Sequence, residues 1–170
     1  EIDLRDPASS THDVLICTHG SRDRCCGQVG SLLFLELAGR LPANIRLWRA
    51  SHTGGHRFAP TGVSFPDGLT WAFLDGHLLS GIINRTLEPA QLHSHLRGCA
   101  GFEGVEQVAD AAAFGKVGWE WIDQPRAVVS KPLGELETEL YIAGPRRQFT
   151  VRVVADTAAP VPVCGEPIET

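Results

Sequence analysis

The order of apolar patterns in the first third of the chain most restricts the fold that it can adopt. A short apolar run at residues 13–17 is followed by residues 28–41, in which leucines recur at every fourth position. That period is typical of one face of a helix, and Pro42 is expected to end the helix. A second strand pattern follows at residues 45–50. The sequence therefore predicts a β-α-β unit.

The next segment has the pattern of a hairpin followed by a helix. Residues 61–65 and 69–74 are apolar runs joined by a Pro-Asp-Gly tripeptide, which is typical of a tight turn. Residues 78–96 have helical character, with an interruption at Pro89. An order of β-α-β followed by β-β-α is typical of a thioredoxin-like fold. We therefore expect an α/β domain in which a mixed sheet is flanked by helices.

The C-terminal part of the chain has a different pattern. Residues 105–117 are rich in alanine and predict a helix, whereas residues 135–142 and 148–154 alternate polar and apolar side chains with the period of a β-hairpin. We therefore expect a thioredoxin-like domain over residues 12–98. Residues 99–170 are expected to form a small α+β appendage, in which a helix, a β-hairpin and an extended tail pack on that domain.

The composition excludes several classes of protein. The chain has 170 residues, of which 43% are hydrophobic and 21% are charged, as in an ordinary globular protein. A net charge of −5 argues against a broad surface that neutralises phosphates, so we expect no nucleic-acid partner. No apolar run approaches the roughly 18 residues that a membrane helix needs, so we expect no membrane partner.

The cysteines are expected to lie in a reducing compartment. The sequence begins with Glu1 and contains no methionine, so we expect it to lack the N-terminal portion of a longer gene product. No secretory signal is recognisable, and the expected location is the cytoplasm. The chain has five cysteines, and an odd number cannot all pair internally. In such a compartment, clustered cysteines and histidines indicate metal or redox chemistry.

Two loops concentrate these residues, and each loop follows one of the first two predicted strands. The first loop comprises residues 17–27 and the second comprises residues 51–57. If the strands are parallel neighbours, both loops emerge at the same end of the sheet, where open α/β sheets place their sites. The side chains that this arrangement would bring into one locality are Cys17, Cys25 or Cys26, His52 and His56.

The types and spacing of these residues indicate a metal. The H-x-x-x-H spacing of His52 and His56 lets both imidazoles reach one site, and the two glycines between them let the backbone approach an anion or a cluster sulfide. Cys17 and Cys26 are too far apart in sequence for a zinc knuckle. Two thiolates and two imidazoles around a diiron cluster would be Rieske-type ligation. Zinc remains an alternative on ligand identity alone.

Two strings in these loops resemble a known family. The strings are Cys17-Thr-His-Gly-Ser-Arg-Asp-Arg-Cys-Cys-Gly27 and Ser51-His-Thr-Gly-Gly-His-Arg-Phe-Ala-Pro-Thr61, and they resemble the sucrase/ferredoxin-like family. Members of that family have a thioredoxin-like ferredoxin domain, in which two cysteines and the two histidines of an H-x-G-G-H motif hold a 2Fe–2S cluster. The resemblance implies the metal ligands Cys17, Cys26, His52 and His56.

The resemblance also implies roles for neighbouring residues. Cys25 is expected to be a bystander, because the family often has another residue at that position. We expect the residues that border the cofactor to include Gly54, Gly55, His19 and Arg57.

The expected function is electron transfer by a carrier without a substrate pocket of its own. Imidazole ligands carry less negative charge than thiolates, which raises the reduction potential, and their second ring nitrogens couple electron transfer to proton uptake. A positive rim of Arg22, Arg24 and Arg57 would suit an acidic redox partner, a reductase or an acceptor. The alternatives are a thiol–disulfide oxidoreductase that uses Cys25 and Cys26, and a zinc-stabilised interaction domain.

Overall fold

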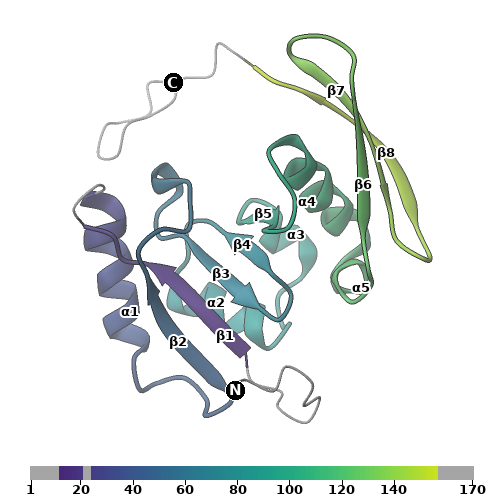
Figure 1. Cartoon of the computed structure of the whole chain (residues 1–170). Helices are drawn as coiled ribbons and strands as arrows, with labels where there is room; N and C mark the ends of the chain where they lie inside the picture. The colour runs from purple at the N-terminus through teal and green to yellow at the C-terminus, as the bar shows by residue number, and fades with distance from the viewer. Residues whose placement is uncertain (1–11, 21–23, 157–170) are drawn as a thin grey trace, which may run out of the picture.

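A five-stranded mixed sheet forms the centre of the computed structural model, which describes residues 12–20 and 24–156 (Figure 1). The order of strands across the sheet is β2-β1-β3-β4-β5. The strands are β1 (His12–Cys17), β2 (Ile45–Ala50), β3 (Gly62–Phe65), β4 (Leu69–Trp71) and β5 (Leu96–Cys99).

The directions of the strands confirm the predicted α/β fold class. β1 and β2 pair in parallel, with Cys17 opposite Ala50, and this pairing requires the crossover through a helix that the leucine pattern predicted. β1 pairs antiparallel with β3, and β3 pairs antiparallel with β4 across the expected hairpin. In that turn Gly68 has a φ of +65°, a conformation that glycine adopts without strain. The observed order, β-α-β followed by β-β, is the thioredoxin-like one.

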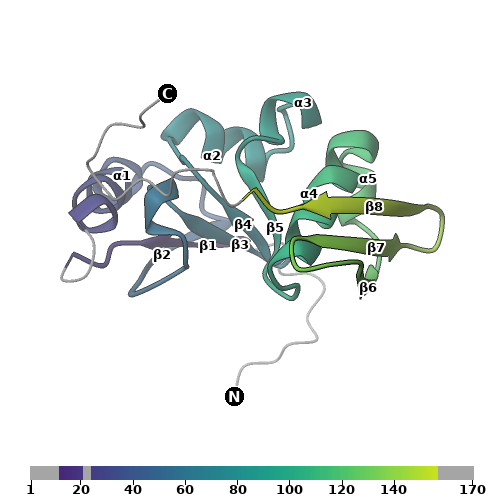
Figure 2. The same ribbon diagram turned by 90° about the horizontal axis from the view of Figure 1, so that it is seen from above.

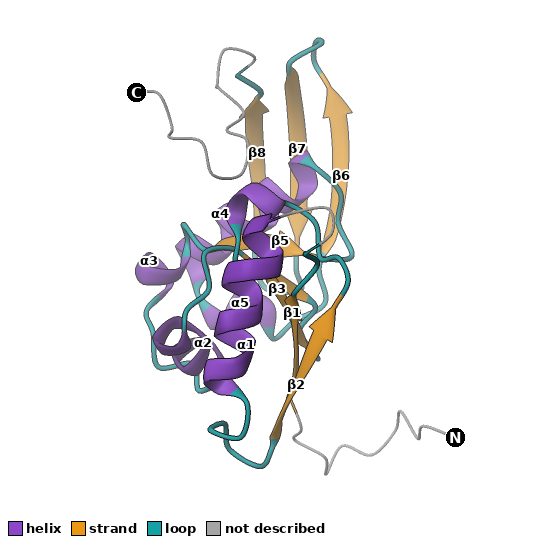
Figure 3. Ribbon diagram, turned by 90° about the vertical axis from the view of Figure 1, so that its left-hand side faces the viewer, coloured by secondary structure: helices purple, strands orange, loops and turns teal. Residues whose placement is uncertain are grey.

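Helices cover one face of this sheet. A short π-helix, η1 (Cys26–Gly30), continues into α1 (Ser31–Leu37), and α2 (Gly76–Ile83) follows the hairpin. Both α1 and α2 lie on the same side of the sheet (Figures 2 and 3). Leu33 and Leu37 of α1 are buried, so the apolar face seen in the sequence is the one that packs on the sheet.

The predicted first helix is too long at its C-terminus. Residues 28–41 were expected to be helical up to Pro42, but α1 ends at Leu37. Ala38 leaves the helical conformation with a ψ of 121°, and Gly39 has a φ of +75°. Gly39 therefore serves as the C-terminal glycine of the helix, and the chain has already turned before it reaches Pro42.

The prediction of a helix up to residue 96 is also wrong. α3 (Pro89–Leu92) is a single turn, and the chain then forms β5, which pairs antiparallel with β4. Within β5, Gly98 has a φ of +101°, and a Cβ at this position would lie 2.5 Å from the backbone oxygen of Gln107. Residues 93–95 therefore form a turn in place of the end of the predicted helix, and the strand that begins at Leu96 lies in close contact with the next helix.

The C-terminal elements form a second layer. The alanine-rich helix has the predicted bounds, and the predicted hairpin is present, but a third strand precedes it, so that the order across this sheet is β6-β7-β8. The elements are α4 (Val105–Val117), α5 (Trp119–Ile122), β6 (Ala127–Pro132), β7 (Glu137–Ala143) and β8 (Gln148–Val154).

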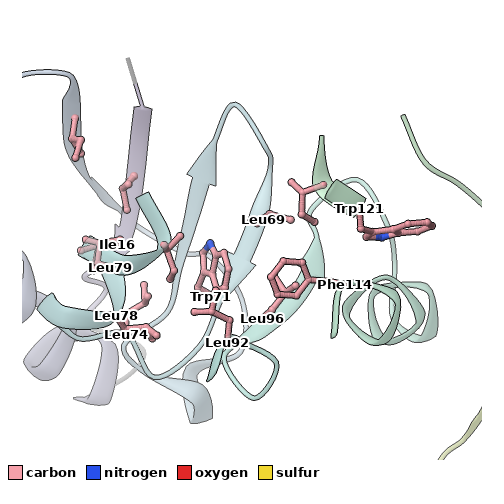
Figure 4. Packing of buried hydrophobic residues seen from close by; sticks show 14 of the residues in the cluster. Ile16, Leu69, Trp71, Leu74, Leu78, Leu79, Leu92, Leu96, Phe114 and Trp121 are labelled. Atoms are coloured by element: carbon pink, nitrogen blue, oxygen red, sulfur yellow. The ribbon is translucent and has the colours of Figure 1, made fainter. Parts of the chain in front are cut away.

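One hydrophobic core joins the two layers. Trp71 of β4 and Phe114 of α4 are fully buried between the five-stranded sheet and α4 (Figure 4). Trp121 of α5 is fully buried as well, and its ring packs on Phe149 of β8. Ile142 of β7 belongs to the same cluster as these residues. The C-terminal elements therefore pack on the first sheet, while the division after residue 98 stays a prediction. Within the described residues, no helix has the length and apolar character to span a membrane.

A buried ion pair lies beneath this boundary. Asp110 of α4 is 0% exposed and Arg126 is 8% exposed, and Arg126 Nε lies 3.0 Å from Asp110 Oδ1. Asp110 also accepts hydrogen bonds from the Trp121 indole at 2.9 Å and from the backbone N–H of Cys99 at 2.9 Å. This single carboxylate therefore connects β5, α4 and α5.

Candidate metal centre

The two predicted cysteine ligands flank the loop between β1 and η1. Cys17 is the last residue of β1 and Cys26 is the first residue of η1. Both side chains are 2% exposed, and both are reduced thiols. Cys25 is disulfide-bonded. Both thiols are therefore shielded from solvent.

Two glycines allow η1 to lie close to the end of β1. A Cβ at Gly30 would lie 2.0 Å from the carbonyl oxygen of Cys17, and a Cβ at Gly27 would lie 2.2 Å from the Cα of Gly20. Both distances are far below van der Waals contact, so no other residue fits at Gly27 or Gly30 without displacing the backbone. The first turn of η1 can therefore approach the end of β1 closely enough to bring Cys26 toward Cys17.

Gly30→Ala is expected to lower the free energy of unfolding by about 1–3 kcal/mol, because the added methyl group overlaps the backbone of Cys17. Urea denaturation measures this change. The matched control is Gly115→Ala in α4, where the new Cβ would lie 3.9 Å from its nearest neighbour. That variant should be more stable by about 0.5–1 kcal/mol, since alanine is the better helix former. If Gly30→Ala is stabilised to the same extent, the proposed contact is wrong.

The predicted histidine loop leaves the sheet at the same edge. The backbone N–H of Thr18 donates to the carbonyl of Ala50 at 3.0 Å, so the segment that follows β1 still lies beside the end of β2. His52 lies two residues after the end of β2 and is exposed. The backbone of His56 begins the short 3₁₀ helix η2 (His56–Phe58), and its side chain lies outside the described part of the structure. The expectation that both loops share one end of the sheet is thus confirmed.

The glycines of the H-x-G-G-H string have backbone conformations that require glycine. Gly54 has a φ of +79° and Gly55 has a φ of +68°. Arg97 of β5 donates from Nη1 to the carbonyl of Gly54 at 3.2 Å, and a Cβ at Gly55 would lie 2.6 Å from the same Nη1. The hydroxyl groups of Thr53 and Thr61 are hydrogen-bonded at 2.8 Å. The loop that carries both histidines is therefore held at several points.

The structure places the remaining predicted site residues around these two loops. His19 is half-buried just beyond β1, Arg57 is half-buried within η2, and Arg24 is exposed at the start of the helix that leads into η1. Arg22 lies outside the described residues. Among the side chains that the structure describes, no three Cys, His, Asp or Glu residues converge on one ion-sized site. The four-ligand set therefore stays a prediction.

A groove next to His52 was not predicted from the sequence. It has a volume of about 860 Å³ and lies on the face of β1 and β2 that no described helix covers (Figure 1). Asp13 accepts hydrogen bonds from Arg46 Nε at 2.8 Å and from the Trp48 indole at 2.6 Å. The hydrogen bond from Arg46 holds the pKa of Asp13 below its ordinary value. Trp48 stays 51% exposed, so an aromatic ring borders the groove that His52 also lines.

The family follows from a comparison of the sequence with known proteins. A family model described as Sucrase/ferredoxin-like matches residues 4–98, which is more than half of the chain. The chain belongs to the Sucrase/ferredoxin-like family. This match covers β1 to the middle of β5 and includes both loops of the candidate centre. The resemblance noted from the two strings is therefore confirmed.

The match to an individual curated relative covers a shorter part of the chain than the family model does. The chain is 40% identical over 58 residues to "Altered inheritance of mitochondria protein 32" of Meyerozyma guilliermondii, a match that covers 31% of this chain and 21% of that protein. The chain thus spans only about a fifth of the length of this relative.

Two solved structures with detectable likeness are thioredoxin-like [2Fe-2S] ferredoxins from Aquifex aeolicus. One is a cysteine-to-serine variant, with 15% identity, a TM-score of 0.35 and coverage of 56% of this chain and 94% of that chain. The other has 19% identity, a TM-score of 0.34 and coverage of 57% of this chain and 87% of that chain. The fold of the present chain is defined by its own strand order and pairing.

Proposed function

We propose that the protein is a one-electron carrier whose 2Fe–2S cluster is held by Cys17, Cys26, His52 and His56. The observation that carries this proposal is the common edge of the sheet. Two reduced, buried thiols lie beside the end of β1, and the H-x-G-G-H loop begins at the end of the parallel neighbour β2. The donor set fits the chemistry of such a cluster, since thiolates and imidazoles are both established ligands of iron in [2Fe–2S] centres.

The bound cluster would supply reversible one-electron chemistry, and the four side chains would set its properties. Cysteine binds as a negatively charged thiolate, whereas histidine binds through a neutral imidazole. Two imidazoles in place of two thiolates therefore leave about two fewer negative charges and favour the reduced state. The ring nitrogen of His52 or His56 that faces away from the metal can hold a proton, so we expect reduction to be coupled to proton uptake.

The proposed partner is an acidic redox protein, either a reductase or an acceptor. Arg24 and Arg57 lie on the two loops of the proposed centre, within a chain whose net charge is −5. A local positive rim on an acidic protein steers an acidic partner toward that rim. We propose the cytoplasm as the compartment, because a reducing environment keeps the thiols of Cys17 and Cys26 available to bind iron, and we expect the disulfide of Cys25 to be reduced there.

Anaerobic purification followed by analysis of iron, acid-labile sulfide and zinc tests the proposed function. We expect a reddish-brown protein with visible absorption and two irons and two sulfides per chain. A colourless protein with one zinc would instead support a zinc-stabilised interaction domain. A protein that contains no metal and catalyses disulfide exchange would support an oxidoreductase. The 2% exposure of Cys26 argues against that last activity, because an attacking thiolate must be accessible.

The reduction potential of the wild-type protein is expected to fall as pH rises, by up to about 59 mV per pH unit where one proton accompanies each electron. His52→Cys should retain a cluster, lower the potential by on the order of 100 mV and weaken its pH dependence, because a thiolate replaces a proton-holding imidazole. Potentiometric titration at several pH values measures both effects. His77→Cys on the exposed surface of α2 is the control and should change neither. A wild-type potential that stays flat from about pH 6 to 10 contradicts the histidine ligation.

A further inference from the structure

Arg97 extends from β5 to the loop that carries the two histidines. Its Nη1 donates to the carbonyl oxygen of Gly54 at 3.2 Å, although the two residues are 43 positions apart in the sequence. The carbon at the centre of its guanidinium group lies 5.0 Å from the centre of the Phe58 ring, a cation–π contact. One side chain of the sheet thus contacts the loop both at its glycines and at the 3₁₀ helix that follows.

The surroundings of Arg97 disfavour its positive charge. Its side chain is half-buried, and this burial lowers the pKa of the guanidinium from its ordinary value. No carboxylate of the described residues forms an ion pair with it. The group nevertheless stays charged, because arginine is not deprotonated in proteins at neutral pH. The backbone carbonyl of Gly54 and the ring of Phe58 are therefore its compensating contacts.

The loop and the guanidinium fit each other closely. The Cβ of any residue other than glycine at position 55 would lie 2.6 Å from Arg97 Nη1 and 2.9 Å from the Phe58 ring. The backbone N–H of Phe58 donates to the carbonyl of Gly55 at 2.9 Å, and the N–H of Phe73 donates to the carbonyl of Phe58 at 2.8 Å. Arg97 thus completes a set of contacts that ties residues 54–58 to β5 and to the segment that follows β4.

We propose that Arg97 is a positioning residue: it fixes the Gly54-Gly55 turn between His52 and His56 and places a positive charge beside the redox centre. The inference rests on the proposed function and goes further, because it assigns a role to a residue outside both ligand loops. A fixed turn holds the two histidines on either side in a constant relative placement. A nearby positive charge in a partly desolvated site favours the addition of an electron.

The positioning role is tested by amide hydrogen exchange on the full chain as purified, monitored by mass spectrometry over residues 51–58. Arg97→Gln should increase exchange in this segment about tenfold, because it removes a charge-assisted hydrogen bond and the cation–π contact. Exchange in β1 should remain at the wild-type rate, which shows that the variant is folded. Arg97→Lys keeps the charge but lacks the planar guanidinium fork, and it should also increase exchange in the segment.

The electrostatic role is tested by the reduction potential of the same variants. Arg97→Gln should have a lower potential than the wild-type protein, whereas Arg97→Lys should stay close to the wild-type value. Arg85→Gln is the matched control, because Arg85 also stacks on a ring at 5.0 Å but lies over Trp119, away from the ligand loops. It should change neither the exchange of residues 51–58 nor the potential.

The proposal is overturned if Arg97→Gln leaves both the exchange and the potential at wild-type values. It is also overturned if Arg85→Gln changes the potential by the same amount, because the effect would then reflect net charge alone. Failure of the proposed function gives a different result. A protein that binds no iron would show this in its metal analysis, and the exchange comparison, which requires no metal, would still decide whether Arg97 fixes the loop.

Discussion

Replacement of Cys26 by serine should abolish cluster assembly, with loss of nearly all bound iron, acid-labile sulfide and visible absorption. Cys26 begins η1 and is buried beside the end of β1, where Cys17 is buried as well. A serine hydroxyl is a far poorer ligand for iron than a thiolate. The backbone of η1 would not shift to bring another ligand to this position, since the close contact between Gly30 and Cys17 fixes where η1 begins. Iron and sulfide analysis after anaerobic purification measures the loss.

Cys25→Ser is the matched control, because it changes the neighbouring cysteine in the same turn. This variant should keep the iron and sulfide content of the wild-type protein. Cys25 is disulfide-bonded, whereas Cys26 is a reduced thiol. If Cys25→Ser loses the cluster and Cys26→Ser retains it, the assignment of the second ligand within this pair is wrong.

Asp110→Ala should lower the free energy of unfolding by about 3–5 kcal/mol, because it leaves the buried guanidinium of Arg126 without its carboxylate. The indole N–H of Trp121 and the backbone N–H of Cys99 would lose their acceptor at the same time. A domain of this size is stable by only about 5–15 kcal/mol, so the loss is a large fraction of the total. Urea or thermal denaturation measures it.

Two further variants make this experiment decisive. The exposed ion pair between Asp123 and Arg85 gives a control, and Asp123→Ala should cost no more than about 1 kcal/mol. A double variant with leucine in place of both Asp110 and Arg126 should recover part of the lost stability, since it removes the unpaired charge as well. A cost below about 1 kcal/mol for Asp110→Ala would show that the buried pair contributes little to stability.

Elements with a long or regular apolar period could be predicted from the sequence. The β-α-β unit, the first hairpin and α4 were predicted at or near their observed bounds, because the side chains that they bury recur with a helical or strand period. β6 was missed because Val128 is the single residue of this edge strand that is not exposed, so its sequence shows no alternation. β5 was missed because it has only four residues and includes Gly98, whose conformation depends on close contact with α4.

The candidate site also has features that the sequence could predict and features that it could not. The common edge of the two loops followed from the parallel pairing of β1 and β2, which is a property of chain order. The roles of Arg97 and Trp48 depend on contacts across 43 and 35 positions, respectively, and neither residue stands out in type or spacing. Only the folded chain shows that Arg97 reaches Gly54 and that Trp48 binds Asp13.

The burial of the Cys17 and Cys26 thiols has a kinetic consequence. With only 2% of each side chain accessible, an alkylating reagent or a metal ion in solution meets these sulfur atoms only while η1 is separated from the end of β1. When the reagent is abundant, the rate at which the thiols react is therefore limited by how often η1 and β1 separate locally. Because Gly30 packs closely against the backbone of Cys17, we expect this separation to be infrequent and the reaction of both thiols to be slow.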